Sequence, residues 1–247
     1  MHYENLPFKY CGSVAVLCEL WTPEPEKVPE GGSPLVIFYH GGGWMFGDKN
    51  GWGVARRWRD MLMEKGVAFA SAGYRHQAYG GHMPTPAADA ADAVRFFRKN
   101  AAEYGINPDK IMLSGHSAGG HLSLLVSLTG DKFRDNWSDK ETECRVCGAV
   151  SLAGPASMQF AAYEKPKFNK GVLDCVRALV GEKWEDAEAV AEAEPIRYVE
   201  RGEAEKVHIL CVQPEEDQIV PPGMAEDICR IGKEKGYDFR RLPLEGT

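Results

Sequence analysis

The chain has 247 residues, of which 44% are hydrophobic and 26% are charged, with 27 glycines and 15 prolines. This is an ordinary globular composition, and it excludes a disordered, collagen-like or coiled-coil chain. Asp and Glu number 36 against 29 Lys and Arg, which gives a formal net charge of −7. Basic side chains are therefore not in excess to neutralise phosphates, and we expect no nucleic-acid partner.

No run of 18 apolar residues occurs, and residues 1–13 lack the basic and apolar regions of a signal peptide. We therefore expect a soluble, cytoplasmic protein without membrane contact. Its seven cysteines are scattered and odd in number, which favours reduced thiols over a disulfide framework. Cys144 and Cys147 form a CxxC pair, but no second pair or nearby His completes a zinc set, so no metal is expected.

Residues 1–30 have the pattern of an antiparallel hairpin, which we expect at a sheet edge. After them, short apolar and β-branched runs predict strands at 34–39, 67–72, 110–113, 146–152, 207–212 and 238–242. Continuous apolar runs such as PLVIFY are typical of strands buried on both faces.

Longer segments that separate these runs predict helices at 53–65, 87–103, 118–128, 170–180 and 222–235. In 87–103, Val94 and Phe97 fall on an apolar face and Arg95 and Arg98 on a polar face. The alternation predicts an α/β fold, a mostly parallel central sheet with helices on both faces.

No Gly/Ser linker divides the chain, so we expect one domain over residues 1–247. Residues 155–201 are polar and rich in Ala and Glu. This stretch is too short for a core of its own, and it is predicted to be a small helical insertion, or cap, above the sheet.

Gly115-His116-Ser117-Ala118-Gly119 is a G-x-S-x-G sequence between a predicted buried strand and a predicted helix, the setting of a nucleophile elbow. In so tight a turn, side chains at positions 115 and 119 would clash with neighbouring backbone. Ser117 is therefore predicted to project from the sheet at a helix N-terminus, where developing negative charge is favoured. The alternative is an ordinary glycine-rich turn from strand to helix.

His40-Gly41-Gly42-Gly43-Trp44 follows the strand at 34–39, where an oxyanion loop is placed in folds with such an elbow. Consecutive glycines let the backbone approach a substrate, with the N–H of Ala118 as the partner donor. A phosphate loop is the competing interpretation, but the Lys-Ser/Thr pair of a P-loop is missing.

Asp217 follows the strand at 207–212 and precedes a helix, so its carboxylate is expected at the carboxyl edge of the sheet. Its place before the apolar pair Ile219-Val220 favours it over Glu215 and Glu216. A helix N-cap or a solvated acidic loop is the alternative.

These segments resemble the α/β-hydrolase esterases of the HGGG type, which are the hormone-sensitive-lipase-like carboxylesterases. The similarity is greatest to their compact acetyl-xylan and feruloyl esterase-like branch. It is carried by HGGGWMFGDK (40–49), AGYR (72–75), MPTPAADAADAVRFFRKNAAEYGINPDKI (83–111), SGHSAGGHL (114–122) and EEDQIVP (215–221). The resemblance implies a nucleophile at Ser117, a triad acid at Asp217, and oxyanion donors at Gly42, Gly43 and Ala118. In such proteins a residue placed as His40 orders the oxyanion loop and is not the base.

The chain departs from this family in one respect. The family places its triad His after the acid, but no His follows Asp217 here. We therefore expect that the C-terminal end is truncated, that the general base lies beyond Thr247, and that a last helix covering the sheet is missing.

Other histidines could in principle serve as the base. Adjacent side chains diverge in an elbow, which disfavours His116, and His121 is expected to pack beside the elbow as structural support. His208 is expected to be a satisfied core residue inside a buried strand. His76 and His82 lie on a loop expected near the pocket rim, and His82 is the first choice for recruitment.

Three functions follow as hypotheses. The first is a serine carboxylic-ester hydrolase that acts on a short acyl ester, such as an acetylated carbohydrate, without metal or organic cofactor. The second is a catalytically inactive protein of this fold that binds a small ligand or partner, and the third is a serine peptidase, which would need an extra domain for which this chain has no room. Trp44, Phe46, Tyr79 and His82 are the expected pocket residues, with the aromatic side chains narrowing the acyl site. The oligomeric state is left open.

Overall fold

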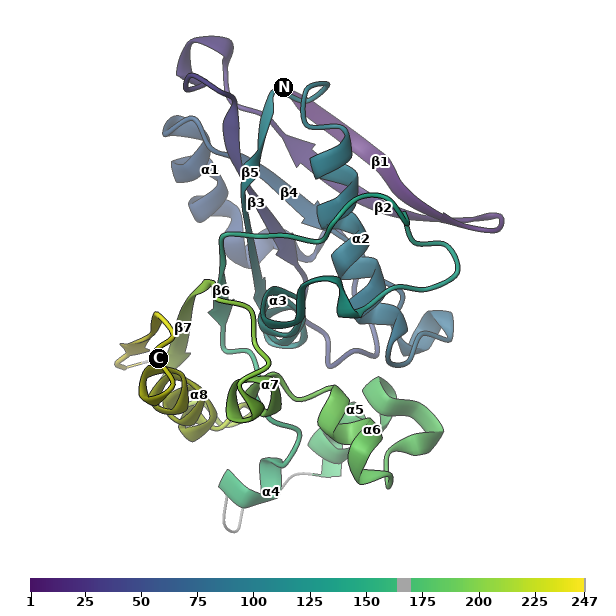
Figure 1. Cartoon of the computed structure of the whole chain (residues 1–247), viewed down its shortest axis with the longest axis vertical. Helices are drawn as coiled ribbons and strands as arrows, with labels where there is room; N and C mark the ends of the chain where they lie inside the picture. The colour runs from purple at the N-terminus through teal and green to yellow at the C-terminus, as the bar shows by residue number, and fades with distance from the viewer. Residues whose placement is uncertain (164–169, 247) are drawn as a thin grey trace.

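The computed structural model describes residues 1–163 and 170–246. Eight strands form one sheet in the order β1-β2-β4-β3-β5-β6-β7-β8 (Figure 1). Pairing is antiparallel between β1 and β2 and between β2 and β4, and it is parallel from β4 to β8. The strands are β1 His2–Cys11, β2 Val14–Trp21, β3 Ser33–Tyr39, β4 Ala68–Ala72, β5 Ile106–His116, β6 Gly148–Leu152, β7 His208–Pro214 and β8 Phe239–Leu244. The predicted edge hairpin and mostly parallel sheet are confirmed.

Helices pack on both faces of this sheet, as predicted. Leu35 and Ile37 of β3 belong to the core under α2, α3, α7 and α8, whereas Val36 and Phe38 face α1. This division follows from the strand itself, because successive side chains point to opposite faces. The helices are α1 Arg56–Glu64, α2 Thr85–Lys99, α3 Ala118–Thr129, α4 Phe160–Tyr163, α5 Lys170–Val180, α6 Ala187–Glu192, α7 Pro195–Arg201 and α8 Pro222–Glu234, with short 3-10 turns that include η2 Gly51–Ala55 and η5 Gly181–Lys183.

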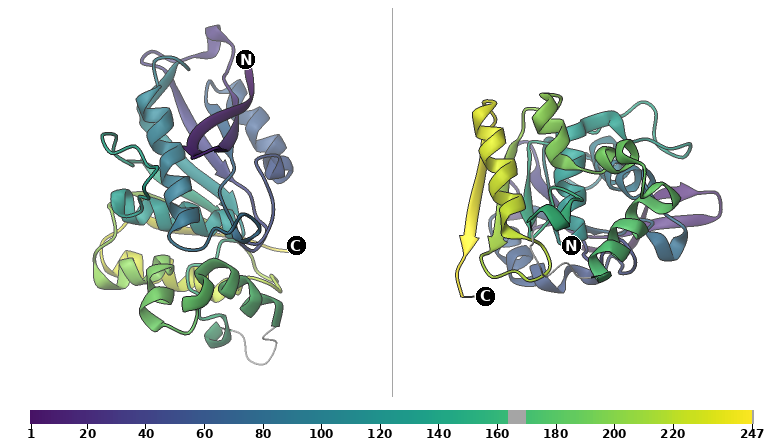
Figure 2. Two further views of the ribbon diagram at one scale, coloured as in Figure 1. Left: turned by 90° about the vertical axis from the view of Figure 1, so that its right-hand side faces the viewer. Right: turned by 90° about the horizontal axis from the view of Figure 1, so that it is seen from below.

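The segment after β6 holds α4 to α7, and α4 to α6 lie beyond the end of the sheet (Figures 1 and 2). Two polar contacts tie α5 to the loop that follows β4: the side-chain Nδ1 of His82 lies 2.7 Å from the Ala178 oxygen, and the backbone N–H of Met83 donates to Leu179 O at 2.7 Å. The insertion predicted at 155–201 therefore packs against loops at the carboxyl edge of the sheet. Part of it, 164–169, lies outside the described residues.

A buried ion cluster connects β1 to α2. Lys9 Nζ lies 2.8 Å from Asp89, 2.6 Å from Asp92 and 2.9 Å from Asp135, and its side chain is almost fully buried. Arg95 is also buried, with Nη1 2.6 Å from Asp92. The expectation that Arg95 occupies a polar outer face is therefore wrong, because the residues between α3 and β6 fold over α2, and Asp131 from that segment pairs with Arg95.

One sheet face is partly open at β6 and β7. Val150 and Leu152 of β6 pair with Leu210 and Val212 of β7, and these four side chains are only half-buried. With Val54, Ala55 and Trp58 they line a shallow apolar hollow of about 410 Å³.

The side chain of His208 points to this same open face. It is 78% exposed, and its Nδ1 lies 2.7 Å from Asp238. The prediction of a core histidine is therefore wrong: His208 begins β7 and shares a face with Leu210, whereas Ile209 and Cys211 point into the core.

Candidate active site

Ser117 lies at the turn between β5 and α3, in a backbone conformation that non-glycine residues seldom adopt. Its φ is 53° and its ψ is −118°, and it is the N-cap residue of α3. Its N–H donates to Leu152 O at 2.8 Å, and its carbonyl accepts from His121 N at 2.9 Å. Strained conformations of this kind occur where surrounding structure fixes them, often at functional sites. The side chain is half-buried at the carboxyl edge of the sheet.

The glycines on either side of Ser117 are required by close packing. A Cβ on Gly115 would lie 2.4 Å from the carbonyl carbon of Gly119, and a Cβ on Gly119 would lie 2.0 Å from the carbonyl oxygen of Tyr39. No real Cβ approaches backbone so closely. The structure therefore agrees with the prediction that side chains at positions 115 and 119 would clash with neighbouring backbone.

The glycine loop after β3 passes directly beside Ser117. A Cβ on Gly41 would lie 3.4 Å from Ser117 Cβ and 3.1 Å from His116 Nδ1. Gly42 and Gly43 have φ values of 123° and 58°. Their amides, and the amide of Ala118 at the start of α3, donate to no other described residue. Free amides at such a place can donate hydrogen bonds to a developing oxyanion.

His40 directly precedes this loop, and its side chain contacts the loop backbone. Its Nδ1 lies 2.7 Å from Gly41 O, its ring stacks on Tyr74 at 4.3 Å, and Tyr74 OH donates to His40 O at 3.0 Å. The ring is buried, and burial lowers the pKa of His40 to about 4. His40 is therefore a neutral group within the loop, in the ordering position that the resemblance implies.

Asp217 lies near the elbow. Its Oδ1 accepts from the amides of Ile219 and Val220 at 2.8 and 2.9 Å, and its Oδ2 accepts from Gln213 Nε2 at 3.0 Å. Burial lowers the pKa of His116, and the negative charge of Asp217 partly opposes this effect. The carboxylate is thus oriented by its own turn and lies within electrostatic reach of the residue next to Ser117. It is not the N-cap of α8, which is Pro221.

All seven histidines lie in the described part of the chain, and none of them is hydrogen-bonded to Ser117 or Asp217 there. Six have other polar partners, namely Glu19 for His2, Gly41 for His40, Gly47 for His76, Ala178 for His82, Trp44 and Ala193 for His121, and Asp238 for His208. His116 alone makes no hydrogen bond to a described residue, and it is exposed beside Gly41. The structure therefore places the glycine loop against Ser117 and Asp217 within electrostatic reach of His116, and among the described residues no histidine is hydrogen-bonded to Ser117 or Asp217.

The four side chains expected to line the pocket differ in how exposed they are. Trp44 is only 2% exposed, and its indole lies against α3. His82 is half-buried between the loop after β4 and the end of α5, and its Cγ would lie 2.9 Å from a Cβ on Gly181. Phe46 and Tyr79 are exposed.

One contact at the glycine loop was not predictable from the sequence. The Sγ of Cys175 on α5 would lie 2.7 Å from a Cβ on Gly43, so the thiol packs directly against that glycine. Burial raises the pKa of this thiol. The insertion therefore forms one wall of the site, beside the Gly43 amide.

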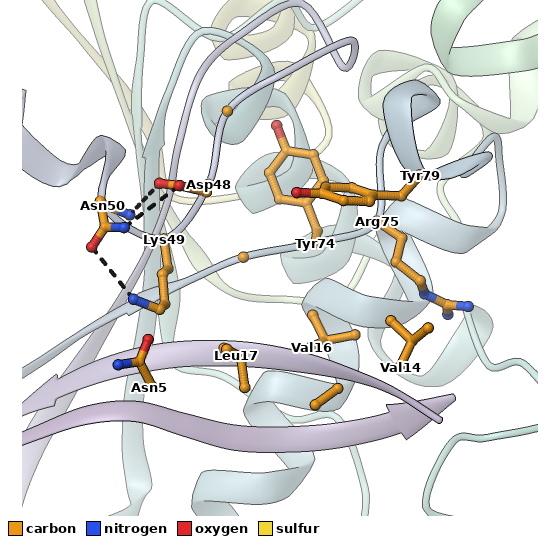
Figure 3. A pocket seen from close by; sticks show the side chains of 13 residues that line it. Asn5, Val14, Val16, Leu17, Asp48, Lys49, Asn50, Tyr74, Arg75 and Tyr79 are labelled. Atoms are coloured by element: carbon orange, nitrogen blue, oxygen red, sulfur yellow. Dashed lines mark hydrogen bonds between the residues drawn. The ribbon is translucent and has the colours of Figure 1, made fainter. Parts of the chain in front are cut away.

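A second hollow lies beside the residues that follow the glycine loop. It has a volume of about 340 Å³ and is lined by the β1–β2 hairpin, residues 47–50 and residues 73–75, with Tyr79 at its rim (Figure 3). Neither Ser117 nor Asp217 lines it. Tyr79 therefore borders this hollow. In the described part of the chain, no helix has the length and apolar character needed to cross a bilayer.

Comparison with known proteins agrees with this geometry. Probable carboxylic ester hydrolase LipM of Mycobacterium tuberculosis is 32% identical over 136 residues, which are 55% of this chain and 31% of LipM. The chain thus spans less than a third of the length of that relative. Among solved structures, a truncated form of a carbohydrate esterase from gut microbiota superposes with a TM-score of 0.83 at 20% identity, covering 100% of this chain and 88% of that one.

A Thermogutta terrifontis esterase, Est2, with propionate bound has a TM-score of 0.78 at 21% identity, covering 98% of this chain and 82% of that one. These two similarities confirm the predicted α/β-hydrolase fold. A family model described as BD-FAE matches residues 19–230, a range that contains the glycine loop, the Ser117 elbow and Asp217. The chain belongs to the BD-FAE family.

Proposed function

We propose that this protein is a serine carboxylic-ester hydrolase that acts on short acyl esters through an acyl-enzyme intermediate. Ser117 Oγ attacks the acyl carbon, and the resulting oxyanion accepts hydrogen bonds from the amides of Gly42, Gly43 and Ala118. The proton of the Ser117 hydroxyl passes to a general base on attack; collapse of the intermediate breaks the ester C–O bond, and the alcohol leaves with that proton. Water then adds to the acyl carbon and gives a proton to the base, which returns it to Ser117 Oγ as the acid is released. The observation that carries the proposal is the strained Ser117 turn lying against a loop whose amides are free.

Asp217 is the proposed triad acid, which would orient a histidine and stabilise its protonated form. Its three hydrogen bonds fix the direction of the carboxylate, which supports this role. None of the seven histidines supplies the general base in the described geometry.

The proposed substrate is a small ester, with an acetyl-like acyl group and a carbohydrate as a candidate alcohol. The close contact of Cys175 with Gly43 supports a short acyl group, because it narrows the space beside an oxyanion donor. The bound propionate named for the Thermogutta esterase and the carbohydrate esterase among the similar structures favour the same substrate class. A series of p-nitrophenyl esters tests this: turnover should be greatest for acetate and propionate, and a maximum at long acyl chains would contradict it.

Covalent labelling tests the nucleophile directly. A fluorophosphonate probe should label Ser117 slowly in the 247-residue protein and faster when imidazole is added, because imidazole is a diffusible general base. Ser117→Ala should abolish labelling. Ser127→Ala removes a buried hydroxyl elsewhere on α3 and is the matched control, which should label like the wild type.

The same experiment separates this proposal from the second candidate, a catalytically inactive ligand-binding protein. That candidate is favoured because, among the described residues, no histidine is hydrogen-bonded to Ser117 or Asp217. Absence of labelling with imidazole present would favour it and refute the esterase. Fast labelling without imidazole would show instead that a base lies within the 247 residues, with His116 as the first residue to substitute.

A further inference from the structure

Trp44 and His121 form a buried polar pair between the glycine loop and the helix that begins at the elbow. Trp44 Nε1 donates to His121 Nδ1 at 3.2 Å, and the two rings meet edge to face at 5.0 Å. Trp44 is 2% exposed and His121 is fully buried. Trp44 directly follows Gly43, and His121 lies in the first turn of α3, whose first amide belongs to Ala118.

The contacts of His121 fix its tautomer. An indole N–H can only donate, so His121 Nδ1 must accept and its proton must lie on Nε2. Nε2 then donates at 2.7 Å to the backbone oxygen of Ala193, the C-cap residue of α6. Burial lowers the pKa of His121 to about 4, which keeps the ring neutral in this arrangement near neutral pH. The imidazole is therefore held in a single orientation from both sides.

The backbone of Trp44 needs such support. Its φ is 58°, immediately after two glycines that also have positive φ values. The left-handed conformation is unfavourable for a non-glycine residue, so it persists only when surrounding contacts maintain it. These three successive conformations set the directions of the Gly42 and Gly43 amides. The indole hydrogen bond and the Gln77 N–H, which donates to Trp44 O at 3.0 Å, hold the end of this turn in place.

From these contacts we infer that His121 is a positioning residue that keeps the two halves of the oxyanion hole in register through the Trp44 indole. One half is the pair of amides at Gly42 and Gly43, and the other is the amide of Ala118. This inference rests on the proposed function. An apolar ring at position 121 could fill the same volume, but it could not accept the indole proton, so the hydrogen bond and not the packing carries the role.

Three variants separate the hydrogen bond from packing. Trp44→Phe and His121→Phe each remove the bond and keep an aromatic ring. His121→Asn places an amide oxygen close to the position of Nδ1, so it can accept from Trp44 again. Ser127→Ala, on the same helix, is the matched control.

The first measurement is the rate of Ser117 labelling by a fluorophosphonate with imidazole present, well below each variant's unfolding temperature. We expect both Phe variants to label about 10- to 100-fold more slowly, because small displacements of oxyanion donors have effects of this size. His121→Asn should recover most of the loss. A purely structural role would lower the unfolding temperature and leave the labelling rate unchanged.

The second measurement is the indole N–H resonance of Trp44, assigned by its loss in Trp44→Phe. Its signal should move upfield and exchange faster with solvent in His121→Phe, and return towards the wild-type position in His121→Asn. Labelling rates in both Phe variants within twofold of the wild type would overturn the inference while leaving the esterase proposal intact. Absence of labelling in the wild type would refute the proposed function, and the positioning role with it.

Discussion

Gly119 and the carbonyl oxygen of Tyr39 pack so closely that a Cβ on the glycine would lie 2.0 Å from that oxygen. The contact joins the first turn of α3 to the end of β3, the strand that leads into the glycine loop. The oxygen cannot move away to make room for a side chain, because it belongs to the backbone of a strand paired within the parallel sheet. The turn that carries Ser117 therefore packs directly against the end of β3, where the glycine loop begins.

Gly119→Ala should therefore destabilise the protein by at least about 2 to 3 kcal/mol and abolish fluorophosphonate labelling of Ser117. Urea unfolding measures the first effect. Gly53→Ala is the control, because a Cβ there meets no described atom within 4 Å, and its free energy of unfolding should stay within about 1 kcal/mol of the wild type. Equal stability of the two variants would show that the elbow can relax.

Enlarging Cys175 should block the site from the insertion side. Cys175→Phe places a ring where the thiol already touches Gly43, so we expect about a tenfold or greater loss of labelling at Ser117. Cys175→Ala keeps the space free and should label at least as fast as the wild type. A Cys175→Phe protein that labels normally would mean that α5 can move away from the loop.

Two buried histidines should make the fold sensitive to acid. Burial lowers the pKa values of His40 and His121 from 6.5 to about 4, so the unfolded chain binds their protons first as the pH falls. Stability is unaffected by them above about pH 7, falls between about pH 6.5 and 4, and levels off below that. Each ring should account for about 3 kcal/mol of this loss.

Urea unfolding at pH 7, 5.5 and 4.5 measures this slope. His121→Asn has no imidazole at this position and should show a smaller loss over the same range, with the part due to His40 retained. An unchanged slope in this variant would contradict the assignment.

Lys9 is a buried residue on the edge strand β1, and its substitution by a neutral residue should strongly lower the free energy of unfolding. Lys9→Met removes the cation that contacts all three of Asp89, Asp92 and Asp135, although Arg75 and Arg95 still pair with these carboxylates, and we expect a loss of about 3 to 5 kcal/mol in the free energy of unfolding. Lys99→Met is the control, because its bond to Asp139 lies in solvent and should matter little. Similar unfolding midpoints for the two variants would refute the role of the cluster.

The sequence predicted the parts of this structure that depend on local pattern. Buried strands such as β3 are recognisable in the sequence as apolar runs. The Ser117 elbow is predictable from the glycine spacing, because no other residue fits at positions 115 and 119. The extra length of β5 before Lys110 was not predictable from its polar residues, since it depends on pairing of Ile106 with Ser33.

Contacts between distant segments were beyond sequence reasoning. Arg95 was expected in solvent because its helix looked amphipathic, yet residues far along the chain bury it. His208 was expected in the core because its strand looked apolar, although alternation along β7 turns it towards the open face. The packing of Cys175 on Gly43 and the bond from Trp44 to His121 likewise join positions that carry no shared motif.

The open strip formed by Val150, Leu152, Leu210 and Val212 has a consequence for the behaviour of the protein in solution. Apolar patches attract one another more strongly in sulfate and less strongly in the cold. Salting-out should therefore begin at a lower ammonium sulfate concentration than for a variant with Leu210→Lys, and chilling should disperse small aggregates that form at room temperature. Light scattering on the two proteins would show how far this strip governs their solubility.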